Sequence, residues 1–177
     1  MSAPLGRSFY RRPATQVARE LLGKTLSFEE ASGRIVETEA YLGEDDGAAH
    51  SARGITPRTQ VIFGAPGHAY LYLIYGMYDC LNIVCEPEGV AGCVLIRALE
   101  PVSGLKGLAN GPGKLTRAMG INRTHNGVDV TKGPITIHAP EHAENFEIAT
   151  SPRIGITKSA DLPLRFFIKG NASVSRR

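Results

Sequence analysis

The chain has 177 residues, of which 42% are hydrophobic and 21% are charged, and its formal net charge at pH 7 is +3. This length suits one domain with an ordinary hydrophobic core, and this composition excludes a disordered or low-complexity chain. The net charge is mild, so it does not by itself identify a nucleic acid or a membrane surface as a partner.

The first elements in chain order are a helix and two strands. Pro13 suits the first turn of a helix, apolar residues follow at helical spacing, and Gly23 ends the pattern, which predicts a helix over 13–22. A short strand ending at Phe28 and a turn come next. Residues 34–41 alternate as a second strand. One face of this strand carries Ile35, Glu37, Glu39 and Tyr41.

The region 43–67 is loop-like, and short strands dominate the chain beyond it. Residues 59–78 contain no Asp, Glu, Lys or Arg, but glycines and a proline interrupt them and aromatic residues alternate, which favours β-structure over a membrane span. The predicted strands are 69–75, 80–85, 92–98, 135–137, 153–156 and 164–168, with a short helix at 114–119. Runs of strands with few helices predict an α+β fold with a largely antiparallel sheet, in a single domain over 1–177.

The cysteines argue against a metal centre. There are three, Cys80, Cys85 and Cys93, with no CxxC pair and no matching histidine cluster. We therefore expect buried reduced thiols and no bound metal. No secretory signal is visible, since a charged amphipathic stretch follows Pro13. These features predict a protein that is not secreted and has no membrane partner, located in the cytoplasm or nucleoid, or in the nucleus of a eukaryote.

Charge is distributed unevenly along the chain. Residues 1–24 and 161–177 are mainly basic, whereas residues 25–50 carry seven acids and one base, Arg34. Basic ends around an acidic centre are compatible with a positive face around a catalytic carboxylate. A solvated charged surface explains the same pattern at least as well, so charge alone leaves the question open.

The pair Glu37 and Glu39 is the first candidate for chemistry. Two acids on one strand face repel each other, so their placement requires a reason. One carboxylate could be a general base that activates water, with Tyr41 beside it as a ring wall. The alternative is that both acids face solvent on an edge strand, and spacing alone favours that alternative.

The second candidate is an aromatic cluster, in which four of the six tyrosines fall within nine residues. Its members are Tyr70, Tyr72, Tyr75 and Tyr78. A tyrosine face can stack on a nucleobase, and the bulky residues Tyr75 and Met77, which flank Gly76 at a bend, could wedge between base pairs. The alternative is an aromatic-rich sheet core, which is the commoner outcome of this pattern, although each buried hydroxyl would then need a partner.

Three further polar residues have a functional and an ordinary interpretation. His50 follows the acidic loop and could hydrogen-bond a substrate, or it could have no role. Arg97 ends an apolar strand and needs a carboxylate partner if it is buried, for which Glu39 is a candidate. Lys114 follows Gly-Pro-Gly at the start of the predicted helix, where it would suit a DNA phosphate, although the spacing does not match a P-loop.

Taken together, these segments resemble the alkyladenine (3-methyladenine) DNA glycosylase family over nearly the whole chain and in the same order. The matching segments are RIVETEAYLG at 34–43, AAHS at 48–51, TPR at 56–58, LIYGMY at 73–78, CLNI at 80–83, VLIRALEP at 94–101, GPGKL at 111–115 and PLRF at 163–166. Asp79 departs from the pattern, because it places a charge where the family has an apolar aromatic residue. The stretch 122–152 is not aligned.

The resemblance implies a set of roles for individual residues. Glu39 would be the general base, with Arg97 and the backbone carbonyl of Ile154 holding the attacking water. The residues implied to line the base pocket are Tyr41, His50, Tyr72, Asn82 and Leu95. Tyr75 would intercalate in the duplex with Met77 beside it, and Lys114 would contact DNA.

The resemblance also implies a fold and an activity. The fold would be a curved antiparallel sheet with a protruding β-hairpin and few flanking helices. The protein would be a monomer that binds double-stranded DNA, flips out a damaged purine and hydrolyses its N-glycosidic bond, without a cofactor and without lyase activity. The alternative is a non-catalytic nucleic-acid-binding module, because a tRNA formyltransferase domain is thought to share this scaffold.

Overall fold

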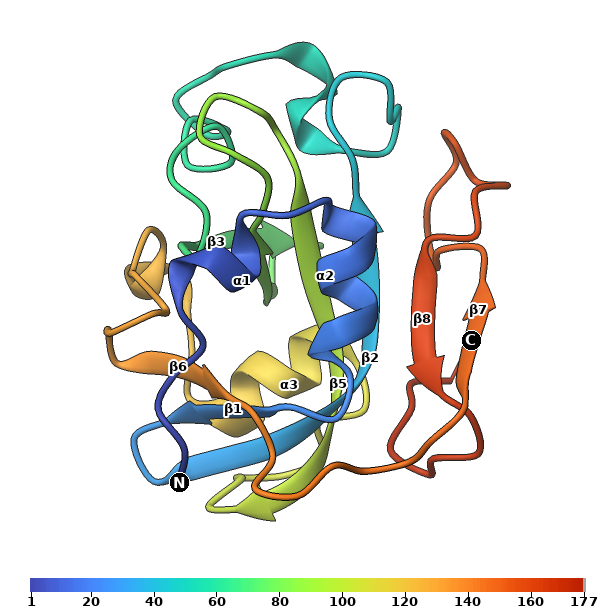
Figure 1. Ribbon diagram of the computed structural model, residues 1–177. Coiled ribbons are helices and arrows are strands. Elements are labelled where there is room, and N and C mark those ends of the chain that lie inside the picture. Colours follow the sequence, from blue (N-terminus) through green and yellow to red (C-terminus); the bar gives the residue numbers. More distant parts are fainter. Residues whose placement is uncertain (177) are drawn as a thin grey trace.

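Eight strands form one antiparallel sheet in the computed structural model, which describes residues 1–176 (Figure 1). Six of them run in the order β3-β4-β5-β2-β1-β6, while β8 pairs with β2 and β7 pairs with β8. The strands are β1 (Thr25–Phe28), β2 (Ala31–Tyr41), β3 (Ala69–Ile74), β4 (Tyr78–Val84), β5 (Cys93–Ser103), β6 (Ile135–His138), β7 (Ile148–Ser151) and β8 (Arg165–Ile168). The helices are α1 (Arg7–Tyr10), α2 (Ala14–Leu21) and α3 (Pro112–Met119), with short 3-10 turns at His50–Arg53 and Arg123–His125. The predicted α+β class with a largely antiparallel sheet is confirmed.

The sheet is strongly curved because its two longest strands, β2 and β5, bend along their length (Figure 1). Their pairing shifts register beside Ser32, Ile35 and Glu37, and such irregularities bend a strand and increase its twist. As a result, β2 pairs with β1 at one end, with β8 over Glu37 to Glu39, and with β5 along most of its length. β2 is therefore an inner strand, and the edge-strand alternative for its two acids is wrong.

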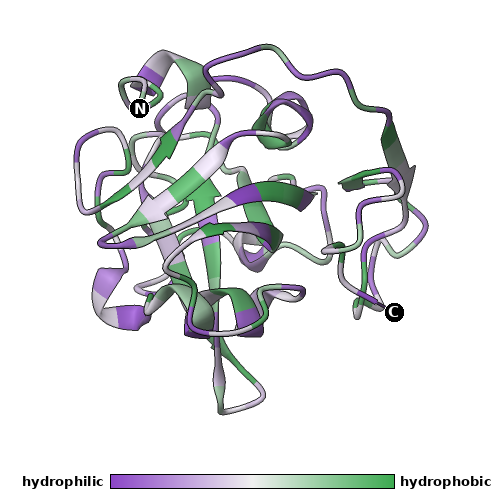
Figure 2. Ribbon diagram, turned by 90° about the horizontal axis from the view of Figure 1, so that it is seen from below, coloured by the Kyte–Doolittle hydropathy of each residue, from purple (hydrophilic) through white to green (hydrophobic). Residues whose placement is uncertain are grey.

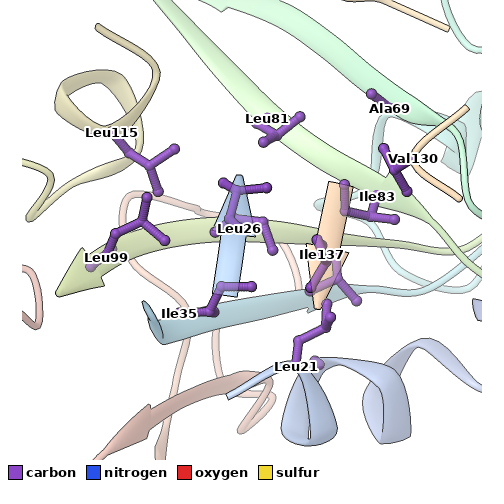
Figure 3. Close-up of a cluster of buried hydrophobic side chains, with 14 of the residues drawn as sticks. Leu21, Leu26, Ile35, Ala69, Leu81, Ile83, Leu99, Leu115, Val130 and Ile137 are labelled. Carbon is purple, nitrogen blue, oxygen red and sulfur yellow. The ribbon is translucent and has the colours of Figure 1, made fainter. Parts of the chain in front are cut away.

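The hydrophobic core lies between the curved sheet and the two longer helices. Helix α2 buries Val17, Ala18 and Leu21, and α3 buries Leu115 and Met119. These side chains meet apolar residues of several strands, which Figure 3 shows as one continuous cluster. The strand residues of this cluster include Leu26, Ile35, Leu81, Ile83, Leu99 and Ile137. The cysteines Cys80, Cys85 and Cys93 are free and buried, as predicted.

The β3–β4 hairpin protrudes from the body of the molecule, at the bottom of the view in Figure 2. At its tip Tyr75 and Gly76 both have positive φ angles, +52° and +66°, in the left-handed region that tight hairpin turns require. This region is unfavourable for a tyrosine. The side chain of Tyr75 is nevertheless 79% exposed and that of Met77 is 62% exposed. The predicted protruding hairpin is thus present, and it presents large apolar groups to solvent.

The strand predicted at 153–156 is wrong. The strand in this region is β7, which ends at Ser151, and the following residues form a loop in which Gly155 has a φ of +73°. Pro152 lacks the N–H that would continue a ladder, and Arg153 points into the protein rather than alternating with its neighbours. Other predicted elements differ only at their ends, and among residues 1–176 no helix is long and apolar enough to cross a membrane.

Candidate active site

A cavity of about 330 Å³ opens between the β3–β4 hairpin, β2, β5 and the loops at 48–58 and 154–156. Most of the site residues expected from the sequence line it: Tyr41, His50, Tyr72, Tyr75, Asn82, Leu95, Arg97 and Ile154. Its size falls in the range of small-molecule sites, and its wall is mainly aromatic and apolar with a few polar groups. Residues separated by more than 100 positions in the chain therefore form one site.

Glu39, the expected general base, has no exposed surface and is not among the residues that line this cavity, but three residues that line it contact its carboxylate. The hydroxyl of Tyr41 donates to its Oε2 at 2.9 Å, the backbone N–H of Ile154 donates to its Oε1 at 2.8 Å, and Nη1 of Arg97 lies 3.5 Å from Oε1. Burial raises the pKa of Glu39, and the charge of Arg97 with the hydrogen bonds from Ile154 and Tyr41 only partly opposes this. A buried carboxylate with a raised pKa is suited to accept a proton near neutral pH.

Glu37 is also fully buried but is held differently. Its Oε1 accepts hydrogen bonds from Nε of Arg97 at 2.9 Å and from Nε of Arg165 at 2.8 Å, and Ser175 donates to both carboxylate oxygens. Burial alone would raise its pKa, but Arg165, Arg97 and Ser175 together hold the pKa below its ordinary value. The partner expected for Arg97 was Glu39, yet its closer carboxylate contact is with Glu37.

His50 and Tyr72 form one aromatic wall of the cavity. Their ring centroids are 4.4 Å apart in an edge-on arrangement, and Nδ1 of His50 is 2.9 Å from the hydroxyl of Tyr70, whose ring is 5.6 Å from that of Tyr72. Burial and then the charge of Arg58 lower the pKa of His50, so its imidazole is neutral at pH 7. Because the two rings are in contact at an interplanar angle of 69°, a planar ligand would stack on the face of one ring and meet the other edge-on, rather than enter between them.

The inner end of the cavity is formed by Asn82 and Leu95, which lie on β4 and β5 and are almost completely buried. The side-chain amide of Asn82 donates to the backbone carbonyl of Tyr70 at 3.3 Å, and its Oδ1 is 3.9 Å from Sγ of Cys93. Burial raises the pKa of Cys93 to about 12, so this thiol is neutral. Asn82 is thereby fixed as a polar group in an otherwise apolar end of the cavity.

The 43–47 loop is attached to the site through a buried ion pair that the sequence did not reveal. Arg153 and Asp46 have no exposed side-chain surface and form two parallel contacts of 2.5 and 2.7 Å. Arg153 also donates to the carbonyl of Ala40 at 3.0 Å, and its guanidinium carbon lies 4.7 Å from the centroid of the Tyr41 ring. Arg153 therefore contacts both the ring of Tyr41 and the backbone of β2 next to it, and Asp46 holds Arg153 in that position.

Of the residues expected to contact DNA, Tyr75 lines the main cavity, whereas Met77 and Lys114 lie outside it. Met77 stands exposed at the hairpin tip beside Tyr75, and Lys114 in the first turn of α3 lines a neighbouring cavity of about 410 Å³ together with Arg97 and Arg176. Asp79, the charged departure from the family pattern, lies 3.0 Å from Nε of Arg123. A cationic side chain therefore lies within ion-pair distance of this charge and offsets part of it.

Comparison with known proteins identifies relatives along the whole chain. A family model described as methylpurine-DNA glycosylase (MPG) matches residues 8–172. A relative from Methanoculleus marisnigri is 47% identical over 191 residues, covering 98% of this chain and 99% of the relative. One from Legionella pneumophila (strain Lens) is 49% identical over 179 residues, covering 97% and 98% respectively. Both are named "Putative 3-methyladenine DNA glycosylase".

Proposed function

The chain belongs to the methylpurine-DNA glycosylase family and is a DNA glycosylase, and from this premise we propose how it acts. It flips a damaged purine out of duplex DNA and hydrolyses the N-glycosidic bond with a water molecule that Glu39 activates. The observation that carries the proposal is Glu39 itself, because this buried carboxylate has a raised pKa and all three groups that contact it line the cavity. Membership of this family argues against the alternative of a non-catalytic binding module.

In the proposed reaction, Glu39 takes a proton from water while the water oxygen attacks C1′ of the deoxyribose. The bond from C1′ to the purine nitrogen breaks, its electron pair leaves with the base, and an abasic site remains. Positive charge develops on the sugar in the transition state, and the Glu39 carboxylate stabilises this charge as well as accepting the proton. Arg97 and the carbonyl of Ile154 hold the water, while the N–H of Ile154 holds the carboxylate at 2.8 Å.

The cavity supports a purine as the group that is bound. The wall of His50 and Tyr72 offers one stacking surface, Tyr41 on β2 offers the other, and stacking on an aromatic side chain contributes about 1–3 kcal/mol per base. Purines alkylated at N3 or N7, such as 3-methyladenine, are cationic, so they are also attracted to the tyrosine faces. Asn82 at the inner end would disfavour guanine by a clash with its exocyclic amine. We propose 3-methyladenine, hypoxanthine and ethenoadenine as the lesion class.

We further propose a monofunctional enzyme that acts as a monomer on double-stranded DNA. Lyase activity requires an amine that forms a Schiff base, and the described residues lining the main cavity include no lysine.

The direct test is a single-turnover assay with a duplex oligonucleotide that contains hypoxanthine or ethenoadenine. The strand is expected to break only after alkali treatment. Absence of any cleavage of these lesions and of 3-methyladenine would overturn the proposal.

Tyr75→Ser tests the wedge at the hairpin tip. Tyr75 is strained, exposed and next to the cavity, so we propose that it fills the space that the flipped base leaves. Loss of its stacking is expected to weaken binding to lesion DNA by about 10- to 100-fold, corresponding to about 1–3 kcal/mol. Binding to undamaged duplex should change much less, because phosphate contacts are retained.

The measurement is a titration of labelled duplexes, with and without ethenoadenine, at one fixed salt concentration. Val102→Ser is the matched control, since Val102 is also an exposed apolar residue (61%) but lies at the far end of β5. An equal loss of affinity for damaged and undamaged DNA would show that Tyr75 is not a wedge.

A further inference from the structure

Glu37 has a set of contacts that the proposed reaction does not use. It has no exposed surface, and its carboxylate accepts four hydrogen bonds: 2.9 Å from Nε of Arg97, 2.8 Å from Nε of Arg165, and 2.7 and 2.8 Å from the backbone N–H and hydroxyl of Ser175. These donors come from β5, from β8 and from the C-terminal segment. Three parts of the chain thus converge on one carboxylate two residues before Glu39.

Arg97 is shared between the two carboxylates. Its Nε donates to Glu37 at 2.9 Å, while its Nη1 lies 3.5 Å from Oε1 of Glu39. The shorter contact fixes the guanidinium through Nε, and the longer one leaves the charge of the Glu39 oxygen only partly compensated by Arg97. Without Glu37, the whole charge of Arg97 would be available to Glu39.

A purely stabilising role does not account for this arrangement. Burying a carboxylate has a large desolvation cost, and a buried ion pair is often no more stable than well-packed apolar residues of the same volume. The network is also placed at the proposed reacting centre rather than elsewhere in the core, because Arg97 lines the cavity and contacts Glu39. A role in the reaction explains both why a carboxylate is buried despite its desolvation cost and why it is buried beside Glu39.

We propose that Glu37 is a positioning residue for the glycosylase reaction, which anchors Arg97 through Nε and competes with Glu39 for its charge, so that Arg97 orients Glu39 without neutralising it. Ser175 completes the arrangement by holding Glu37 as an anion, which makes the C-terminal segment part of the active site. This inference rests on the proposed function, because it requires Glu39 to be the base.

The charges around Glu39 give the expected direction of the effect. The ionisable groups that face it from the surrounding elements are Glu37 and Tyr41 on β2, Cys80 on β4, Arg97 on β5, Arg153 after β7 and Arg165 on β8. Burial is the main cause that raises the pKa of Glu39, the charge of Arg97 lowers it, and the charge of Glu37 raises it. Removal of the Glu37 charge therefore lowers the pKa of Glu39.

The test is the pH profile of single-turnover excision by wild type and Glu37→Gln, with ethenoadenine duplex and enzyme in excess. The rate of wild type rises with pH as Glu39 loses its proton. In Glu37→Gln this acidic limb is expected to move to lower pH, because the neighbouring negative charge that raises the pKa of Glu39 is removed. The plateau should fall by about tenfold, because Glu39 is then a weaker base and the glutamine oxygen holds Arg97 by a neutral hydrogen bond in place of an ion pair.

Asp129→Asn is the matched control. It removes a carboxylate from another ion pair, with Arg7 at 2.5 Å, which lies outside both cavities. This variant is expected to lose stability but to keep the wild-type pH profile. If the acidic limb of Glu37→Gln coincides with those of wild type and Asp129→Asn, Glu37 is only structural and the inference is overturned.

Two further variants keep the test decisive. If Glu37→Gln does not fold, Ser175→Ala removes a single donor at 2.8 Å and leaves the Glu37 charge less compensated, so the acidic limb should move to higher pH. An unchanged limb in Ser175→Ala would then overturn the inference. Glu39→Gln distinguishes failure of the proposed function from failure of this inference. If Glu39→Gln excises the base at the wild-type rate, Glu39 is not the base and the proposed function is overturned. If Glu39→Gln is inactive but the pH profile of Glu37→Gln is unshifted, only the role of Glu37 is overturned.

Discussion

Glu39→Gln is expected to lower the single-turnover rate of lesion excision by about 10²- to 10⁴-fold while the variant still binds lesion DNA. Glutamine has nearly the same shape, and its carbonyl oxygen can still accept from the N–H of Ile154 or the hydroxyl of Tyr41. It cannot accept a proton from water, and it does not stabilise the positive charge that develops on the sugar. The loss should therefore appear in the chemical step and not in affinity.

The excision rate and the affinity need to be measured on the same ethenoadenine duplex. Glu44→Gln is a suitable control, since Glu44 is an exposed acid in the loop that follows β2, and it should behave as wild type. A Glu39→Gln variant that excises the base within about threefold of wild type would be incompatible with general-base catalysis by this residue. A variant that loses affinity and rate together would instead indicate a role in binding.

The local elements of the fold could be predicted because their signals are local. Pro13 and Gly23 bracket α2, and alternation over 34–41 marks the central part of β2. The Tyr75–Gly76–Met77 bend lies at the tip of the hairpin, where the left-handed conformation of Gly76 is needed. The resemblance to a family added the curvature of the sheet and the protrusion of the hairpin, which no local pattern contains.

The failures share a physical cause, which is that the partner of a buried charge is set by distant parts of the chain. Spacing alone favoured solvent exposure for Glu37 and Glu39, because their partners are 60, 115, 128 and 138 residues away. Arg153 was assigned to a strand by its apolar neighbours. Its partner Asp46 is 107 residues earlier, and the requirement to pair that buried charge outweighed the β-propensity of the segment.

The requirement that a buried charge has a partner was nevertheless a signal that could have revealed more of the site. Arg165 lies within the PLRF segment at 163–166, which matches the family, although neither charge pattern nor spacing gave it a role. An arginine in a strand whose neighbours are Leu164, Phe166 and Phe167 is costly to bury unless a carboxylate compensates it. Arg97 was expected to need a compensating carboxylate, and the same requirement held for Arg165. The two acids of β2 were the available partners.

Asp46→Asn is expected to destabilise the protein by about 3–5 kcal/mol, a large part of the 5–15 kcal/mol typical of a domain. Asp46 and Arg153 are both fully buried and form two contacts of 2.5 and 2.7 Å. Asparagine retains one acceptor but no charge, so the guanidinium would remain buried beside the Tyr41 ring without a counter-ion. Urea unfolding gives the change in free energy, and Asp45→Asn, at the exposed neighbouring acid, should change it by less than about 0.5 kcal/mol.

The double variant Asp46→Asn/Arg153→Met distinguishes a mispaired charge from lost packing. If the cost of the single variant is the uncompensated guanidinium, removal of that charge should recover a part of the lost stability, on the order of 1–2 kcal/mol. If the loops at 43–47 and 153–156 are held mainly by the shape of the pair, the double variant will be less stable than Asp46→Asn. In that second case the rate of excision should fall together with the stability in both variants. The reason is that the Arg153 guanidinium lies 4.7 Å from the Tyr41 ring, and the residue after Arg153, Ile154, donates its backbone N–H to Glu39.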